Sequence, residues 1–360
     1  MLWASGAAAR TAPPGEPTSV GGGFATDRIL VKAEKGASRA VAEASRRVHA
    51  SSRGEIPGSG VSLVGLPEGL PVEEAIERYE AAPGIEYAER DFVMTEAALF
   101  PRDPRFKTQY GLHNRGQTGG RSDADVDAPE AWSLTAGSRA VVIAVVDSGN
   151  YTRHADLRDN LWINPGEVAG NRVDDDKNGY VDDVNGWDFA HKDNTLYHGY
   201  EEDDHGTHVA GVAAARGNNG VGIAGVAWRS RIMPLKYIGP GGSGYTSDAV
   251  AAIDYAIKKG ASIINISSGC GNCFNQSMLD AIKRADAAGR LVVTTAGNTG
   301  RNNNVTPRYP CNYASPNVIC VAATDDRDVL AGFSNYGSST VDLAAPGVEI
   351  PGTVPNGAYA

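Results

Sequence analysis

A regular alternation of strand-like and helix-like segments after residue 140 constrains the fold of this chain more than any other feature. Residues 140–147 (AVVIAVVD) form a nearly continuous apolar run ending on an acid, as is typical of a buried parallel strand. The alternation predicts the α/β class, with a doubly wound, mostly parallel sheet covered by helices on both faces. Ser247 is the expected cap of one helix, and Gly260 its expected end. The further expected elements are helices over 205–215, 246–260 and 275–289 and strands over 230–238, 262–268, 290–297 and 317–325.

A smaller unit is expected ahead of this sheet, over residues 24–98. Strand-like and helix-like patterns follow one another there in the order β-α-β-α-β, which predicts a small open α/β sandwich. Residues 1–23 lack a continuous apolar segment, so no signal peptide is evident, and we interpret them as a flexible leader. Residues 99–121 are turn-rich and basic, as expected for a linker at the start of a second domain over 99–360.

The overall charge and hydropathy exclude two classes of partner. The formal net charge is −10, which disfavours binding to nucleic acid, and no apolar run is long enough to span a membrane. Four cysteines are compatible either with two disulfides in one of three pairings or with free thiols. A zinc ribbon is excluded because only one C-x₂-C pair occurs; the four are Cys270, Cys273, Cys311 and Cys320.

Polar residues stand at the ends of three expected strands, where sheets of this class bind ligands. Asp147 ends the first strand, Ser267 to Gly269 follow another, and Asn298 follows a third. An acid such as Asp147 can simply form a turn or cap, but His205 opens a helix nearby, and an imidazole held by a carboxylate is a general-base arrangement. Asn298 is either a turn former or a hydrogen-bond donor to an oxyanion.

His205 and His208 also permit a metal-binding interpretation. Pairs of ligating histidines on one helical face usually stand at i and i+4, often with a glutamate between them. Here the spacing is i and i+3, with Gly206 and Thr207 between, and no third ligand is evident nearby. We therefore favour one functional histidine, His205, and one that packs on the helix surface.

Six sequence blocks together resemble the subtilisin-like serine proteases, or subtilases. The blocks are IAVVDSGNYTRHADL, HGTHVAGVAAA, GIAGVA, IINISSG, VVTTAGN and FSNYGSSTVDLAAPG, and the resemblance covers about residue 103 to the last residue. It implies that Asp147 is the acid and His205 the base of a catalytic triad, and that Asn298 donates to the oxyanion. It also implies a secreted, monomeric endopeptidase that acts on polypeptides, with residues 24–98 as its intramolecular inhibitor rather than an unrelated module.

The chain departs from the family pattern after its AAPG block. The family continues into a Gly-Thr-Ser-Met-Ala helix that carries the nucleophile, whereas this chain stops at Ala360. We expect a truncated protein, inactive as it stands, with the nucleophile beyond Ala360; the alternative is an inactive relative that binds peptides as a scaffold. Self-processing is expected between Thr95 and Arg102.

Two glycine-containing segments are expected to flank a bound peptide, by the same resemblance. Glycine suits such segments because an incoming strand approaches their backbone closely. Ser268 stands where the family commonly has leucine, and Thr295 where a small alanine is usual, so substrate preference stays open. The residues implied in substrate binding are Gly242, Ser243, Gly244, Ser267, Ser268 and Gly269.

Calcium is the expected cofactor, at two sites. Asp174, Asp176 and Asn178 alternate before Gly179 like the first half of an EF-hand loop, although Asn185 at the twelfth position excludes a complete one. Asp182 or Asp183 could supply a further oxygen. The resemblance implies a second site, formed by Asp103, Asp156 and Asn219 with backbone oxygens of the loop over 217–223.

Overall fold

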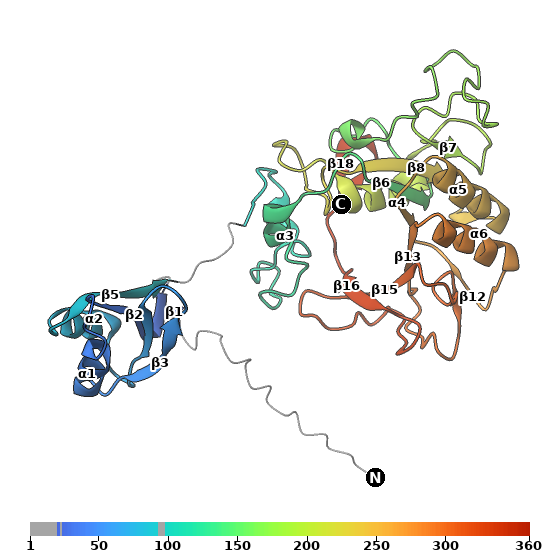
Figure 1. Ribbon diagram of the computed structural model, residues 1–360. Helices are drawn as coiled ribbons and strands as arrows, with labels where there is room; N and C mark the ends of the chain where they lie inside the picture. Colours follow the sequence, from blue (N-terminus) through green and yellow to red (C-terminus); the bar gives the residue numbers. More distant parts are fainter. Residues whose placement is uncertain (1–19, 22–23, 93–97) are drawn as a thin grey trace, which may run out of the picture. The chain divides into compact units, whose positions relative to one another are not determined.

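The computed structural model describes residues 20–21, 24–92 and 98–360, and the chain divides into two compact units, Met1–Glu96 and Ala97–Ala360 (Figure 1). Apart from residues 20–21, the leader expected over 1–23 lies outside the described residues. The same is true of residues 93–97, where the expected processing segment begins.

The first unit is an antiparallel sheet with two helices. Its central strand β2 pairs with β4 on one side and β5 on the other, β3 lies outside β4, and β1 pairs with the start of β2. The core includes Tyr79, whose hydroxyl lies 2.7 Å from Ser45 Oγ. The elements are β1 (Val20–Gly21), β2 (Phe24–Ala33), α1 (Ala40–Arg47), β3 (Ser51–Ile56), β4 (Val61–Gly65), α2 (Val72–Glu80) and β5 (Ile85–Phe92).

Strand β3 is an addition to the β-α-β-α-β order predicted for this unit. All six of its residues are exposed, and its sequence, SSRGEI, has no alternation of apolar and polar side chains. An edge strand of this kind is held by backbone hydrogen bonds to β4, so the side-chain pattern does not indicate it. Apart from β3 and the short strand β1, which lies within the leader expected over 1–23, the predicted small α/β sandwich is confirmed.

The second unit is built on a seven-stranded parallel sheet, which confirms the predicted doubly wound α/β fold. The strand order is β16-β15-β13-β11-β6-β8-β7. The sheet strands are β6 (Val142–Asp147), β7 (Trp187–Asp188), β8 (Arg231–Lys236), β11 (Ile263–Ile266), β13 (Leu291–Thr295), β15 (Val318–Thr324) and β16 (Leu343–Pro346). The helices are α3 (Ala128–Leu134), α4 (Tyr200–Ala214), α5 (Thr246–Lys258) and α6 (Gln276–Ala287), with short 3₁₀ turns at Phe106–Thr108, Arg158–Asn160 and Pro355–Gly357. Short paired strands outside the sheet are β9 (Ile238–Gly239), β10 (Ser243–Gly244), β12 (Cys270–Gly271), β14 (Arg308–Tyr309), β17 (Thr353–Val354) and β18 (Ala358–Tyr359).

Helices cover both faces of this sheet. Successive residues of a strand point to opposite faces, so a central strand such as β6 packs against helices on both sides. In β6, Ala144 and Val146 pack with residues of α5 and α6, which lie side by side (Figure 1). Ile143 and Val145 pack instead with residues of α4. Burial of each of the larger side chains, Ile143, Val145 and Val146, contributes about 1.5–3 kcal/mol, so β6 is held firmly between two layers.

Two helix boundaries differ from the prediction. Helix α4 begins at Tyr200, five residues before His205, and its first turn carries three acidic residues. Carboxylates near a helix N-terminus are favoured by the helix dipole, although an acidic run in a sequence is typical of a loop. Helix α5 begins after Tyr245, and its N-cap residue makes no side-chain capping bond, so the predicted Ser247 cap is wrong.

The cysteines form two disulfides, Cys270–Cys273 and Cys311–Cys320.

Among the residues that the structure describes, no helix is long and apolar enough to cross a membrane.

Candidate active site

Asp147 ends β6 with a fully buried carboxylate, at 0% exposure. Its Oδ1 atom accepts a hydrogen bond from the backbone N–H of Ser148 at 2.7 Å and lies 2.7 Å from Nδ1 of His205. Its Oδ2 atom is buried without a hydrogen-bond partner in the described part of the chain. A buried carboxylate is costly unless its charge is compensated, so the His205 ring is a major source of its stabilisation.

Helix α4 brings His205 to this carboxylate through a close approach of two backbones. The hydroxyl of Ser148 accepts a hydrogen bond from the Gly206 N–H at 2.9 Å. A Cβ atom on Gly206 would lie 2.1 Å from the carbonyl oxygen of Gly149, so only glycine allows this contact. Ser148 therefore joins the end of β6 to the helix.

The hydrogen bond to Asp147 determines the electrostatics of His205. It raises the pKa of the His205 ring, against an opposing effect of burial, and the nearby charge of Asp204 adds to the increase. Because this pKa is raised in the folded state, the pair stabilises the fold below the ordinary histidine pKa, and the contribution is lost as the pH rises through the raised value. The side chain is 55% exposed, so water screens part of this effect.

The same contact orients the ring. With Nδ1 directed to Asp147, Nε2 is the nitrogen that can take or give a proton on the solvent side. An imidazole with one nitrogen on a buried carboxylate and the other free is suited to general-base chemistry.

Lys236, which was not predicted from the sequence, lies between the end of β6 and the first turn of α4. Its side chain is fully buried, and Nζ donates to the carbonyl oxygen of Ser148 and to Oδ1 of Asp203 at 2.6 Å. Nζ also lies 2.9 Å from Oε1 of Glu202. Lys236 thus connects the end of β6 to the first turn of α4. Lys236 directly follows the apolar residues IMPL of β8, and this was the available signal, since a buried ammonium needs an acid nearby.

The other expected site residues lie beyond neighbouring strands. Strand β11 lies next to β6, the strand of Asp147, and β13 lies next to β11. Ser267 to Gly269 follow β11, and Asn298 follows β13. Parallel strands end at the same edge of a sheet, which places all of them at one edge. Asn298 is exposed, and Ser267 Oγ accepts a hydrogen bond from Asn265 Nδ2 at 2.8 Å.

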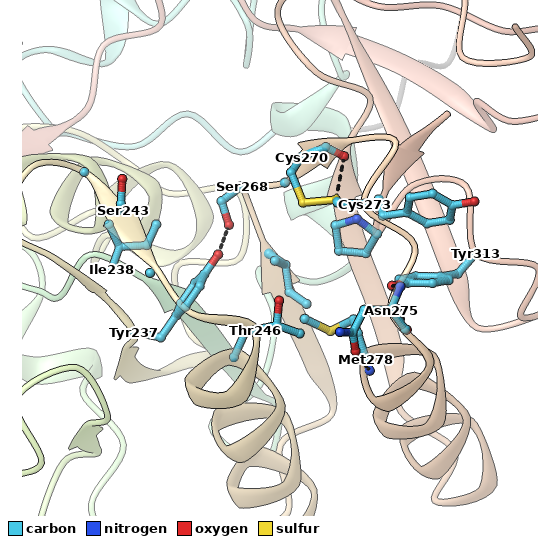
Figure 2. Close-up of a pocket in the computed structure, with 17 residues that line it drawn as sticks. Tyr237, Ile238, Ser243, Thr246, Ser268, Cys270, Cys273, Asn275, Met278 and Tyr313 are labelled. Carbon is cyan, nitrogen blue, oxygen red and sulfur yellow. Dashed lines mark hydrogen bonds between the residues drawn. A yellow bond between two sulfur atoms is a disulfide. The ribbon is translucent and has the colours of Figure 1, made fainter. Parts of the chain in front are cut away.

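A pocket of about 290 Å³ lies between the two segments expected to flank a peptide (Figure 2). Gly242, Ser243 and Gly244 line one side, and Ser268 and Gly269 another. Figure 2 shows the Tyr237 hydroxyl directed at that of Ser268, and these two groups form a hydrogen bond. The Cys270–Cys273 disulfide lines the same pocket.

His208 lies apart from the Asp147–His205 pair. Its Nε2 atom is 2.9 Å from the carbonyl oxygen of Ile350, so the ring contacts a segment far along the chain. Neither His205 nor His208 belongs to any group of potential metal ligands within residues 24–92 and 98–360. The geometry thus favours a helix-packing role for His208 over metal binding with His205.

The acidic loop after residue 166 brings together three carboxylates, from Glu167, Asp174 and Asp176, with oxygens within 4.8 Å of one another. Glu167 was missed in the sequence analysis because it lies outside the D-x-D-x-N-G spacing. Burial raises the pKa of Asp176, but hydrogen bonds from Lys259 and Asn164 lower it more, so this carboxylate is charged at neutral pH.

Two other residues predicted in this loop have local partners. Asn178 donates from Nδ2 to Asp183 Oδ2 at 2.8 Å and accepts from the N–H of Tyr180. The two oxygens of Asp182 accept hydrogen bonds from the N–H groups of Gly170 and Arg172, both at 2.8 Å.

Asp103, Asp156 and Asn219 come together in the structure. Asp103 accepts from the N–H groups of Asn218 and Asn219, and Asn219 Nδ2 donates to Asp156 Oδ1 at 2.9 Å. Burial raises the pKa of Asp103, backbone hydrogen bonds lower it, and the nearby negative charge of Asp156 raises it further. The two buried carboxylates offer oxygen ligands of the kind that Ca²⁺ takes, whereas the Asn219 amide oxygen accepts a hydrogen bond from the Val221 N–H at 2.8 Å.

Comparison with known proteins decides the family. Residues 138–359 match the model of the subtilase family. The chain belongs to the subtilase family. Residues 11–91 match the model of the fervidolysin N-terminal prodomain, so this subtilase carries a prodomain ahead of its parallel sheet.

Several relatives are similar over most of the chain. Thermitase from Thermoactinomyces vulgaris is 38% identical over 72% of this chain and 78% of its own length. The thermophilic serine proteinase of Bacillus sp. strain AK1 is 37% identical over 80% of this chain, which spans only 61% of that relative. A solved protease structure from Pseudoalteromonas arctica has a TM-score of 0.52 and 32% identity, covering 69% of this chain and 72% of that one.

The pKa of His205 tests the geometry of the pair. Replacing Asp147 by asparagine removes the hydrogen-bonded negative charge, so we expect the His205 pKa, followed by NMR titration of the ring, to fall below the wild-type value. The control is Asp204→Asn, which removes only a more distant charge and should give a smaller decrease. An unchanged His205 pKa in Asp147→Asn would contradict the contact.

Lys236→Met tests the buried ammonium. The substitution leaves Asp203 buried without its cation, so we expect a loss of about 3–5 kcal/mol in the free energy of unfolding. The matched control is Arg284→Met, which breaks the half-exposed pair with Asp254 and should cost less than about 1 kcal/mol. Equal losses for the two substitutions in denaturant titrations would show that the buried Lys236–Asp203 pair contributes no more to stability than the half-exposed one.

Proposed function

We propose that this chain carries the acid, the base and the peptide-binding segments of a calcium-stabilised serine endopeptidase that is made as a zymogen. The 2.7 Å contact between Asp147 Oδ1 and His205 Nδ1 is the main support, since it orients an imidazole at the sheet edge where peptide-flanking segments end. Family membership supports the reaction type.

In the proposed reaction, Asp147 holds His205 so that Nε2 takes the proton of a serine hydroxyl. In this proposal a Gly-Thr-Ser segment outside residues 1–360, which contain no such sequence, supplies the serine. Its oxygen attacks the peptide carbonyl, and Asn298 donates a hydrogen bond to the resulting oxyanion. His205 then gives the proton to the leaving amine, and water hydrolyses the acyl-enzyme by the same base.

We assign the substrate backbone to the two segments beside the pocket. Gly242 to Gly244 and Ser267 to Gly269 would pair with an extended peptide as added strands. A substrate side chain would enter the pocket between them, where the hydroxyls of Tyr237 and Ser268 meet.

The prodomain is proposed to act as an inhibitor of its own catalytic domain. We divide the chain into a leader over 1–23, the prodomain over 24–98 and the peptidase domain over 99–360, with processing between Thr95 and Arg102. The match to a prodomain model over residues 11–91 supports this role. The two disulfides are consistent with a protein that works outside the cell.

The test is peptide hydrolysis by the protein made from the complete reading frame. We expect Asp147→Asn and His205→Ala to lower kcat by about 10⁴-fold or more, a magnitude known from serine proteases, subtilisin among them, rather than derived from this structure. The control Asp204→Asn should stay within about tenfold of the wild type, since it leaves the triad in place. Wild-type rates in Asp147→Asn or His205→Ala would overturn the proposal.

The alternative is an inactive relative that binds peptides as a scaffold. Peptide binding without hydrolysis, in the complete wild-type protein, would establish this alternative.

We further propose two Ca²⁺ sites, one at Asp103, Asp156 and Asn219 and one at Asp174 and Asp176 with Glu167. Asn178 and Asp182 would hold the loop of the second site in place through their hydrogen bonds instead of binding the ion. Asp176 Oδ1 and Glu167 Oε2 are buried oxygens without hydrogen-bond partners in the described part of the chain, so both are available as ligands to a cation. Bound Ca²⁺ would neutralise these carboxylates and hold the loops together.

Removal of calcium should therefore destabilise the protein. At a concentration 100 times the dissociation constant, each site would add about 2.7 kcal/mol, so EGTA should lower the melting temperature measured by calorimetry. Asp156→Asn and Asp174→Asn should each reduce this response, whereas Asp286→Asn, on the exposed face of α6, should leave it intact. A melting temperature that does not respond to EGTA would exclude both sites.

A further inference from the structure

Asp188, His191 and His198 converge beside the first turn of α4, in a cluster that the proposed mechanism does not use. His191 Nδ1 lies 2.8 Å and His198 Nε2 lies 3.0 Å from the same oxygen, Oδ2 of Asp188. Asp188 ends the short strand β7 and is fully buried. Three potential ligand atoms, one from each residue, lie within 4.8 Å of one another.

The arrangement of these side chains is well defined. The two imidazole rings stack with their centroids 4.1 Å apart and an interplanar angle of 27°. The second oxygen of Asp188, Oδ1, accepts a hydrogen bond from the backbone N–H of His191 at 2.9 Å. Outer hydrogen bonds of this kind orient a ligating carboxylate and leave its other oxygen directed at the centre of the cluster.

Negative charge exceeds positive charge around the cluster. Glu202 Oε1 lies 3.6 Å from His191 Nε2, and this oxygen and the buried carboxylate of Asp203 both pair with Lys236. Three carboxylates, those of Asp188, Glu202 and Asp203, thus lie around the cluster, but the Lys236 ammonium pairs with only two of them, Glu202 and Asp203. The side-chain ion pairs of Asp188 are with His191 and His198. Excess charge of this kind in a buried place is costly, and a divalent cation would balance it.

We propose that Asp188, His191 and His198 bind a divalent transition-metal ion of the zinc type. Two imidazoles and one carboxylate are donors that Zn²⁺ prefers, whereas Ca²⁺ takes oxygen ligands. The fourth position is open to water or to Glu202. The site is separate in residues and in donor chemistry from the two proposed calcium sites.

The cluster is accessible to ions from solvent. The side chains of His191 and His198 are 31% and 25% exposed. His191 also lines a surface hollow together with Ser243 and Gly244 of β10. A bound ion would tie the loop over 188–198, which borders this hollow, to β7, and so stabilise the wall beside a proposed substrate segment.

Calorimetric titration of Zn²⁺ into the chelator-stripped full chain, in the presence of excess Ca²⁺, tests the proposal. We expect one equivalent to bind, with at least tenfold weaker binding in His191→Gln, His198→Gln and Asp188→Asn. The control His205→Ala should keep wild-type affinity, because it removes the histidine of the candidate active site instead. Unchanged affinity in the cluster variants, loss of binding in His205→Ala, or no binding by the wild type would each overturn the proposal.

Cobalt gives a second readout, which reports on the ligands and geometry of the bound ion. Co²⁺ in a site of this kind should show strong visible absorption, lost in His191→Gln and His198→Gln but kept in His205→Ala. Circular dichroism establishes that each variant is folded before titration. These measurements need no proteolytic activity, so their failure is distinguishable from failure of the proposed function.

Discussion

The buried carboxylate of Asp147 is the constraint on which the rest of the site depends. A charge at the end of a strand covered on both faces cannot be hydrated, so the structure surrounds it with donors. The Ser148 N–H and the His205 ring supply them at 2.7 Å each. The partner that stabilises the carboxylate is thereby also the group oriented for proton transfer.

Helix α4 must approach β6 very closely for this contact, and two features make that possible. Gly206 allows the helix backbone to meet the carbonyl oxygen of Gly149. Lys236 binds Asp203 in the first turn of the helix and the Ser148 carbonyl at the strand end. The position of His205 thus depends on a buried ion pair that takes no direct part in the proposed chemistry.

Many of the other acidic residues lie in or beside loops that bring their carboxylates close together. Asp103 with Asp156, the Glu167 to Asp176 loop, and Asp188 with its two histidines each concentrate negative charge that the surrounding protein only partly neutralises. Different donors at these places suit different cations, since all-oxygen groups favour Ca²⁺ and imidazoles favour zinc-type ions. Cations would therefore stabilise loops that contribute little apolar burial themselves.

The sequence by itself determined the α/β class, the prodomain ahead of it, the positions of Asp147 and Asn298 at or after strand ends, and the place of His205 on a helix. These follow from local periodicity and from the order of six short blocks, both of which are properties of neighbouring residues. Strand β3 and the true start of α4 were not evident, because backbone pairing and helix-end electrostatics hold them without an apolar pattern. Only the tertiary structure showed that Lys236 meets Asp203 and that His191 and His198 share Asp188. Such contacts join side chains from different elements, and the packing of those elements, rather than spacing along the chain, decides which charges are buried together.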